Sequence, residues 1–473
     1  MYTYQDLEPL NDELDKAKFC KDAVSEFRSS QSYKDAVDGE AYYAKHNLTI
    51  ENYQKMIITL SGAKRPDIFS SNHKLKTLFF RRLTLQQIQY VLGNGVTLQN
   101  SNNKKKLGKD FDFKLITCAK RAMASGRGFG FWNLDHLEVF GYADTANHAG
   151  FCPLYDAHTS ELRAGIRFWF RYDDSIEILR CTLFEEDGYT EYKIEDNEPS
   201  VVAEKRAYIT NVRKTQSGII EDVTEENYGK LPIVPLYAND THESELVGIR
   251  ESIDCYDLIK SGLANNIDDA SEIYWILKNT GGMDDVDIAR FMQRIKTVHG
   301  ATVDGDEGAD AEAHQIQVPT EARKTMLEIL RKDIYEDFQA LDVNTLSASA
   351  KTTQEIQASY QAQDNKCADF EYFIIDFVQK ILELAGIDDN PTFVWNKIIN
   401  QSEQTSMILS SANYLTDEAV IKHLPFLTPE EADEIIKQRD AEAMSRTFDD
   451  NDEPQDEPQG DEAEEDEAEE DEE

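Results

Sequence analysis

The sequence is poor in basic residues and has neither a long apolar run nor a closely spaced cysteine pair. Its 473 residues contain 49 Lys and Arg against 91 Asp and Glu, a formal net charge of -42. No apolar stretch approaches the roughly 20 residues that a membrane-spanning helix needs. The first residues, MYTYQDLEPLNDELD, carry acids where an export signal carries bases. We therefore expect neither membrane association nor export.

The cysteines lie too far apart to suggest a disulfide framework or a zinc site. None forms a C-x-x-C pair, and the six positions are Cys20, Cys118, Cys152, Cys181, Cys255 and Cys367. Isolated cysteines of this kind are typical of buried thiols in a reducing compartment. We interpret all six as core residues.

Acidic charge is concentrated in residues 449–473, which hold 17 acids and no base. The remaining chain keeps 74 acids and 49 bases, or -25. A protein that grips nucleic acid needs a basic surface to neutralise phosphates, so any contact with DNA is expected to be loose or local. Residues 449–473 are too charged and too poor in apolar groups to fold, and we predict a disordered tail.

One basic stretch departs from this balance. Residues 64–127 contain 14 bases and three acids, including Arg81, Arg82 and Lys104 to Lys106. We interpret it as a solvated face that pairs with acidic residues of another subunit, with a nucleic-acid patch as the alternative.

Hydrophobic periodicity predicts an α+β protein. Three- and four-residue spacing, after a mainly helical start, predicts helices at 72–92, 113–124, 244–269, 319–341, 352–385, 416–424 and 429–444. A period of two predicts antiparallel strands at 136–140, 165–172, 176–184 and 189–193. Ile166, Phe168 and Phe170 alternate with Arg167, Trp169 and Arg171, which indicates a sheet covered on one face.

Two irregular segments interrupt the long helices. Residues 273–318 look like a small inserted unit, with strands near 272–277 and 315–318 around a helix near 286–295. Residues 343–351 (VNTLSASAK) are small and polar without a pattern, which predicts a loop between two helices.

Motifs of catalysis or cofactor binding are weak. Gly126, Gly128 and Gly130 run from helix to strand, the reverse of a dinucleotide fingerprint, and there is no G-x-x-x-x-G-K-[ST] phosphate loop. The acidic loop from Asp304 to Asp310 lacks the glutamate that completes an EF-hand, so a solvated hairpin tip is favoured over calcium binding. We predict no cofactor, no metal and no catalytic residue.

A cluster of hydrolase-like residue types keeps one enzymatic alternative open. Its members are Asp135, His136, His148, Asp156 and His158. Their spacing matches no named metal site, and each is expected at a strand end or in a loop. A metal-dependent nuclease using this cluster is the alternative to a structural protein.

Four passages, taken in order, resemble the bacteriophage portal protein family, in the branch typical of long-tailed phages of Gram-positive bacteria. They are YVLGNGVTLQN (90–100); GFGFWNLDHLEVF with FCPLYD and ELRAGIRFWFR; LPIVPLYAND with LVGIRESIDCYDLIKSGLANNIDDASEIYWILKNTGG; and ILSSANYLTDEAVIKHLPFLTPEEADEIIKQRD. Together they span most of residues 80–440. The family's tunnel segment often shows Ser-Gly where this chain has Ser347-Ala348.

The resemblance implies a portal fold divided into wing, stem, clip, tunnel loop and crown. The wing would be residues 1–243, with N-terminal helices in 1–125 and a β-rich part in 126–237. Stem helices would be 244–272 and 319–342, with the clip at 273–318 between them. Residues 343–351 would form the tunnel loop, 352–404 the long wing helix and the segment after it, 405–448 the crown and 449–473 the acidic tail.

The resemblance also implies site residues and partners. The DNA-facing tunnel loop would be Val343, Asn344, Thr345, Leu346, Ser347, Ala348, Ser349, Ala350 and Lys351. The clip surface for terminase and connector proteins would include Met283, Asp284, Asp285, Asp304, Asp306, Glu307 and Asp310. Expected partners are further copies in a dodecameric ring, double-stranded DNA without sequence specificity, the terminase large subunit, major capsid and scaffolding proteins, and a head-completion protein. The protein would act at the capsid portal vertex after assembly in the host cytoplasm. A minor head protein without a channel is the second alternative.

Overall fold

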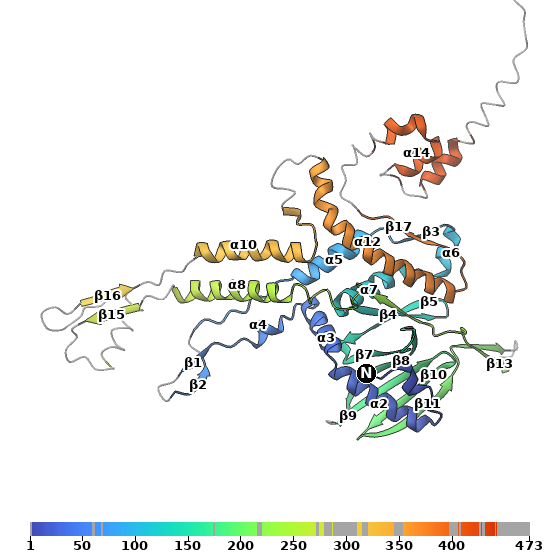
Figure 1. The fold of residues 1–473 in the computed structure, drawn as a ribbon, viewed down its shortest axis with the longest axis horizontal. Helices are drawn as coiled ribbons and strands as arrows, with labels where there is room; N and C mark the ends of the chain where they lie inside the picture. Colours follow the sequence, from blue (N-terminus) through green and yellow to red (C-terminus); the bar gives the residue numbers. More distant parts are fainter. Residues whose placement is uncertain are drawn as a thin grey trace, which may run out of the picture. The chain divides into compact units, whose positions relative to one another are not determined.

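The computed structural model describes residues 2–58, 62–67, 70–173, 176–214, 220–270, 274–278, 286, 310–314, 320–344, 353–396, 405, 408–424, 427, 431–439 and 441. Residues 1–396 form one compact unit and residues 397–473 a second. Figure 1 shows a mixture of long helices and antiparallel sheets in the first unit. Among the described residues, no helix combines the length and apolar composition that crossing a membrane requires. The predicted α+β class is confirmed.

A six-stranded antiparallel sheet lies at the centre of the β-rich part. Its spatial order is β11-β10-β9-β8-β7-β6. The strands are β6 (Ala143–Asp144), β7 (Ala149–Tyr155), β8 (Leu162–Asp173), β9 (Ile176–Glu185), β10 (Gly188–Glu195) and β11 (Glu198–Arg206). The predicted strands coincide with β8, β9 and β10, and with β5 of the sheet described next.

Coverage of this sheet agrees with the predicted one-sided burial. Ile166 and Phe168 are fully buried, whereas Arg167 and Arg171 are exposed. The buried face packs against α2 (Glu13–Ser29), whose Phe27 contacts Phe168 with ring centroids 6.1 Å apart. The helix α3 (Gln31–Tyr43) follows α2 after Ser30, and short α1 (Tyr4–Leu7) precedes it. The alternation along β8 therefore reflects a sheet with one helix-covered face and one solvated face.

A smaller sheet, ordered β14-β4-β5, is buried on both faces. Its strands are β4 (Arg127–Asn133), β5 (His136–Gly141) and β14 (Ile233–Tyr237). Phe129 and Phe131 of β4 belong to the core of the larger sheet, while Trp132 belongs to the core formed with α7 (Phe111–Ser125) and α12 (Thr353–Leu384). A Cβ atom on Gly130 would lie 2.5 Å from Phe377 of α12. This glycine therefore permits close packing of the helix on the strand.

The long helices meet in a third core. This core joins α3, α5 (Phe79–Leu92), α8 (Arg250–Ala270) and α10 (Thr320–Asp337) through Phe80, Ile253, Ile334 and Phe338. Leu330 and Ile334 of α10 are buried, as is the apolar face of α12 from Tyr360 to Leu384, whereas Leu327 of α10 is half-buried. The helix predicted at 244–269 begins only at Arg250, because residues 245–249 form hydrogen-bonded turns. Near its end, Ile267 is 54% exposed.

Short strand pairs complete the first unit. They are β1 (Met56–Ile58) with β2 (Lys64–Pro66), β3 (Val96–Leu98) with β17 (Pro391–Phe393), β12 (Ile209–Lys214) with β13 (Ile220–Glu226), and β15 (Tyr274–Lys278) with β16 (Asp310–His314). The second strand of the inserted unit was predicted at 315–318, but β15 pairs with residues 310–314. Residues 315–318 lie outside the described part. The inserted helix is described at Val286, which is helical.

The second unit is helical where it is described. It contains α14 (Asp417–His423), capped by the Thr416 hydroxyl, and a further helix at 431–439. Val420, Ile421 and Ala432 are buried, and Arg439 pairs with Asp417 at 2.7 Å. Both helices occupy predicted ranges. Residues 449–473 lie outside the description.

Candidate functional site

The predicted tunnel loop begins where α10 ends, so its anchoring residues define the candidate site. Its first two residues, Val343 and Asn344, are helical and exposed, so the predicted loop is wrong at these two positions. Asp342 accepts hydrogen bonds from the guanidinium of Arg331 at 2.8 and 3.1 Å and from the amide of Asn344 at 3.1 Å. The start of the loop is therefore tied back to α10. Thr345, Leu346, Ser347, Ala348, Ser349, Ala350 and Lys351 lie outside the described residues.

A buried ion pair holds α12 against the end of α10. The ammonium of Lys366 lies 2.6 Å from a carboxylate oxygen of Glu245, and both side chains are largely buried, at 16% and 10% exposure. The same ammonium donates to the carbonyl of Phe338 at 2.9 Å and lies 3.7 Å from the centroid of its ring. Asn239 donates to the second oxygen of Glu245 at 2.9 Å. Lys366 thus joins three segments that are far apart in sequence.

Neutral hydrogen bonds reinforce this junction. The amide of Leu341 donates to Gln363 of α12 at 3.2 Å, and Gln86 of α5 donates to the carbonyl of Leu341 at 2.9 Å. Tyr90 of α5 donates to Asp364 and stacks on Tyr360 with ring centroids 5.9 Å apart. The segments on both sides of the predicted loop are consequently fixed to α5.

An extended strap, residues 71–78, runs along α8. The amides of His73, Leu75 and Thr77 donate to Asn265 (2.6 Å), Ser261 (2.9 Å) and Asp257 (3.0 Å), respectively. Every second strap residue thus meets every fourth helix residue. The two repeats match because two extended residues span about 6.6 Å and four helical residues about 6 Å.

The strap corrects the predicted helix at 72–92. The helix begins at Phe79, because the amides of the preceding residues bond to α8 and not to one another. Asp257 is completely buried and also accepts from Asn47 at 3.0 Å. Burial raises the pKa of Asp257, although its hydrogen bonds from Thr77 and Asn47 act in the opposite direction.

The hydrolase-like residues do not gather into one site. Asp135 and His136 lie at the β4–β5 turn, His148 precedes β7, and Asp156 and His158 lie in the β7–β8 turn. Asp156 accepts hydrogen bonds from the amides of Thr159 and His158, and these bonds lower the pKa of Asp156. The hydrogen bond with His136 lowers the pKa of Asp135. Across the described ranges, no three His, Cys, Asp or Glu side chains are placed as metal ligands. The cluster has ordinary turn-forming roles.

The basic stretch pairs within the chain. Lys76 contacts Glu51 at 2.5 Å, Lys104 contacts Asp112 at 2.8 Å, and Arg121 contacts Glu40 at 2.8 Å. These three side chains thus have acidic partners within their own chain. Of the six cysteines, which are spread along the chain, five are buried as expected and Cys255 is partly exposed.

The clip residues are mostly beyond what the structure describes. Met283, Asp284, Asp285, Asp304, Asp306 and Glu307 lie outside the described residues. Asp310 begins β16, and its backbone is opposite Lys278 of β15.

Sequence reasoning missed Lys366, Glu245 and the strap. Polar residues at 257, 261 and 265, four apart on a helix, were a signal that could have indicated a buried polar row.

Comparison with known proteins decides the family. The model of phage portal proteins of the SPP1 Gp6-like type matches residues 30–445. The chain belongs to the SPP1 Gp6-like family of phage portal proteins. The match includes the four passages whose resemblance was noted, and portal proteins are structural components of the virion, not enzymes. Family membership therefore excludes the nuclease and the minor head protein.

Individual relatives are distant but match over most of their length. The portal protein of Clostridium phage phiCD119 is 23% identical over 434 residues, which cover 86% of this chain and 93% of that protein. The portal protein of Bacillus phage SPP1 is 23% identical over 421 residues, covering 83% and 81%. Membership of the portal family implies an oligomeric ring.

Two solved structures also align with this portal protein. The neck of an empty gene transfer agent particle has a TM-score of 0.43 and 9% identity, covering 76% of this chain and 95% of that chain. The virion of a native gene transfer agent particle gives the same TM-score and identity, covering 72% and 88%.

Proposed function

We propose that this portal protein forms a dodecameric, ring-shaped DNA channel at one capsid vertex, through which the genome is packaged, retained and ejected. The observation that carries the ring is an uncovered apolar surface on the two helices assigned to the stem. Leu258 and Ile267 of α8 are 41% and 54% exposed, and Met326 and Ile329 of α10 are 39% and 48% exposed. Exposed apolar patches of this kind are typical of protein interfaces.

A groove between the two helices supports side-by-side packing of copies. Leu258 and Gly262 of α8 and Ala322 and Met326 of α10 line a groove of about 350 Å³. Side chains of a neighbouring copy can enter such a groove as helix ridges do. We assign residues 244–272 and 319–342 to the stem, 1–243 to the wing, 273–318 to the clip and 405–448 to the crown on this basis and on the family order.

Charge supports passage of DNA without tight binding. The body of the chain carries an excess of 25 acids even without residues 449–473. A channel with a negative lining repels phosphates, so that a duplex slides without being trapped. The chain has no phosphate-binding loop motif, and we assign force generation to a terminase large subunit docked on the clip. Scaffolding, major capsid and head-completion proteins would contact the outer surfaces.

Electron microscopy of the purified protein tests the ring. We expect turbine-shaped particles with a central hole. Met326→Asp with Ile329→Asp should abolish them, because both side chains are exposed in one copy and would be buried between copies. Val394→Asp is the matched control, since Val394 is 62% exposed but lies outside the stem helices. A stable monomer at high concentration would refute the proposal.

The tunnel loop has a separate test. We propose that residues 343–351 shift between subunits to follow the DNA and resist backsliding, while the junction at Lys366 and Gln363 holds the flanking helices. Replacing the loop by a shorter, rigid turn should leave rings intact and reduce the amount of packaged DNA. Normal packaging by such particles would contradict this role.

A further inference from the structure

The hairpin β12–β13 carries an apolar pair that its own chain leaves uncovered. It forms a two-stranded sheet separate from the six-stranded one. Val212 and Val223 lie directly opposite each other in its register and are 45% and 49% exposed. By the alternation of strand side chains, Thr210 and Glu225, also paired, share their face. Because an isolated hairpin is marginally stable in water, an exposed apolar pair on one suggests a surface that meets a partner.

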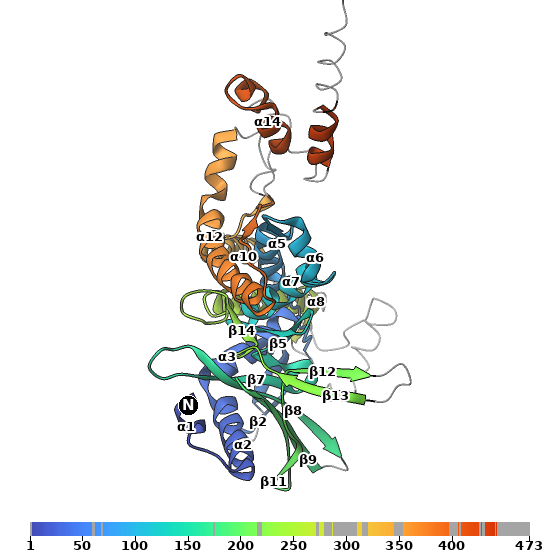
Figure 2. The same ribbon diagram turned by 90° about the vertical axis from the view of Figure 1, so that its right-hand side faces the viewer.

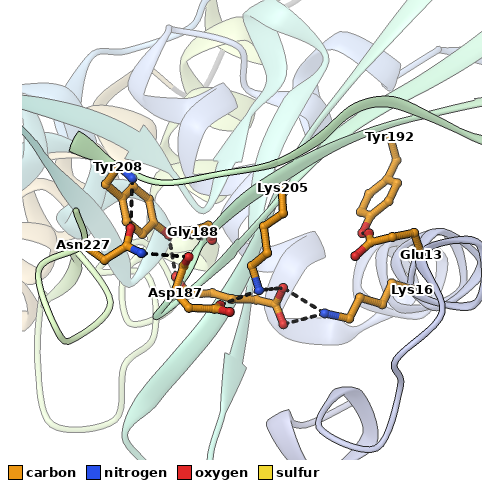
Figure 3. A network of polar contacts seen from close by, with 9 residues as sticks. Glu13, Lys16, Asp187, Gly188, Tyr192, Lys205, Tyr208 and Asn227 are labelled. Atoms are coloured by element: carbon orange, nitrogen blue, oxygen red, sulfur yellow. Dashed lines mark hydrogen bonds and ion pairs between the residues drawn. The ribbon is translucent and has the colours of Figure 1, made fainter. Parts of the chain in front are cut away.

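The base of this hairpin is firmly held, as Figure 3 shows. The amide of Tyr208 donates to Asn227 at 3.0 Å, and Asn227 donates to the carbonyl of Asp187 at 2.9 Å. The Tyr208 hydroxyl donates to the carbonyl of Glu185 at 2.6 Å, and the Glu185 carboxylate pairs with Lys16 and Lys205. The two ends of the hairpin, at Tyr208 and Asn227, are therefore fixed beside the β9–β10 turn. Figure 2 shows the hairpin projecting beyond the six-stranded sheet.

An aromatic groove lies at the opposite edge of the same sheet. It has a volume of about 620 Å³ and lies between α2, α3 and the ends of β6 to β8. Its lining includes Arg28, Tyr33, His148, Phe168, Phe170 and Tyr172. Asp144 also lines the groove, and its carboxylate lies 3.4 Å from the guanidinium of Arg121. The strand β7 pairs with β8 as far as Trp169. Beyond it, the amide of Phe170 bonds to the carbonyl of His148, and no described strand pairs with Tyr172 on that side.

The charges of the groove and the hairpin are complementary. The guanidinium of Arg28 lies 4.3 Å from the centroid of the Phe170 ring. Within the described part of the chain, Arg28 has no carboxylate at ion-pair distance. Glu225 is exposed on the apolar face of the hairpin and forms no ion pair with any described residue. A carboxylate brought to the groove would gain a cationic partner, and the two valines would gain aromatic neighbours.

The placement of the two surfaces suits a ring. In the order β11-β10-β9-β8-β7-β6, the hairpin follows β11 and the groove borders β6 to β8. Three to five strand spacings of about 4.8 Å therefore separate β11 from the strands that border the groove, or roughly 14 to 24 Å. Copies related by rotation in a closed ring contact each other through two different surfaces, one from each side. One copy cannot bring its own hairpin to its own groove across the sheet.

We propose that the β12–β13 hairpin of each copy docks into the Arg28–Tyr172 groove of the next copy. This inference rests on the proposed ring, and it names a contact outside the stem helices that supported the ring. Val212 and Val223 pack against Phe170 and Tyr172, and Glu225 pairs with Arg28. The hairpin thereby links neighbouring wings while the stems form their own interface.

Cysteine cross-linking tests the contact in assembled protein. All variants carry Cys255→Ser, because the other five native thiols are buried. Val212→Cys with Tyr172→Cys should give, after mild oxidation, a ladder of disulfide-linked oligomers on a non-reducing gel. Asn211→Cys with Tyr172→Cys is the matched control, since Asn211 is also exposed but belongs to the other face of the hairpin. We expect at least fivefold less ladder from it and none from either single variant.

A charge reversal gives an independent measurement. Glu225→Lys should raise the concentration needed for half-assembly about fivefold at low salt, and Arg28→Glu in the same chain should restore it. If the Val212→Cys, Tyr172→Cys protein forms rings in electron micrographs but gives no ladder, the docking is refuted and the portal ring is not. The same holds if the Asn211→Cys control gives an equal ladder. Purified protein of the natural sequence that stays monomeric at high concentration would overturn both proposals.

Discussion

Asp257→Asn is the substitution that most directly probes how α8 is held to the body of this portal protein. Asp257 is fully buried and accepts from the Thr77 amide with both oxygens, at 3.0 and 3.2 Å, and from Asn47 at 3.0 Å. An asparagine keeps one acceptor oxygen but directs an NH₂ group toward these donors. Asn47 cannot simply rotate to compensate, because its own oxygen accepts from Tyr42 and from the Ile50 amide.

The expected size follows from leaving a buried donor unsatisfied. That loss is worth about 1–3 kcal/mol, and each 1.4 kcal/mol corresponds to a factor of about ten. Hydrogen exchange of the strap amides should therefore accelerate about tenfold to a hundredfold in Asp257→Asn. Ser261→Ala should have a smaller effect centred on Leu75, whose amide it accepts at 2.9 Å.

Hydrogen–deuterium exchange with peptide resolution over residues 71–78 is the assay. Asp254→Asn is the matched control, because Asp254 lies one turn earlier on α8 and accepts from the hydroxyls of Tyr42 and Thr49, but from no strap amide. Its strap should exchange as in the natural protein. Unchanged protection in Asp257→Asn would show that the polar row on α8 does not hold the strap.

The remaining predictions concern pH, the loop junction and one glycine. Burial raises the pKa of Asp257, so through this group the folded chain binds more protons than the unfolded chain above a pH of about 4. Its contribution to stability, followed by urea unfolding, should fall as pH rises through that window. Asp257→Asn should reduce the slope, and the part that remains comes from groups such as Glu40, whose pKa burial also raises. Lys366→Met should lower the free energy of unfolding by about 3 kcal/mol, because it leaves the buried Glu245 carboxylate with Asn239 as its remaining partner. Adding Glu245→Gln to Lys366→Met should recover part of this lost stability. An equal loss in the single and the double variant would contradict a charge effect. Gly126→Ala should destabilise the protein by about 1–3 kcal/mol in thermal unfolding. Gly126 has φ 81°, and an added Cβ atom would lie 2.4 Å from the carbonyl oxygen of His242. Gly248→Ala should be neutral, because no atom lies within 4 Å of the position its Cβ would take.

Much of the secondary structure could be predicted from local pattern. The apolar face of α12 runs from Tyr360 to Leu384 at helical spacing, and Gly386, with φ 66°, follows its end. The alternation along β8 predicted which face of the sheet is buried. These patterns are predictive because the side chains on the buried face recur at the period of the helix or strand. The family could be inferred from four ordered passages, which the match over residues 30–445 confirmed.

Contacts between distant segments were beyond the sequence. The strap at 71–78 has a helix-like apolar spacing, yet its amides bond to Asp257, Ser261 and Asn265, some 190 residues away. Gly126, Gly128 and Gly130 resembled a dinucleotide fingerprint only superficially, and the fold shows that Gly130 gives room to Phe377 of α12.

The chain's own sequence thus determined most of its helices, the three central strands β8 to β10 of the main sheet, its acidic balance and its family. Tertiary structure alone decided which polar side chains became partners, as Lys366 with Glu245, and which apolar side chains remained uncovered, as Val212 and Ile329. The physical reason is that periodicity reports whether a face is buried, whereas hydrogen bonding and exposure depend on which segment arrives opposite it.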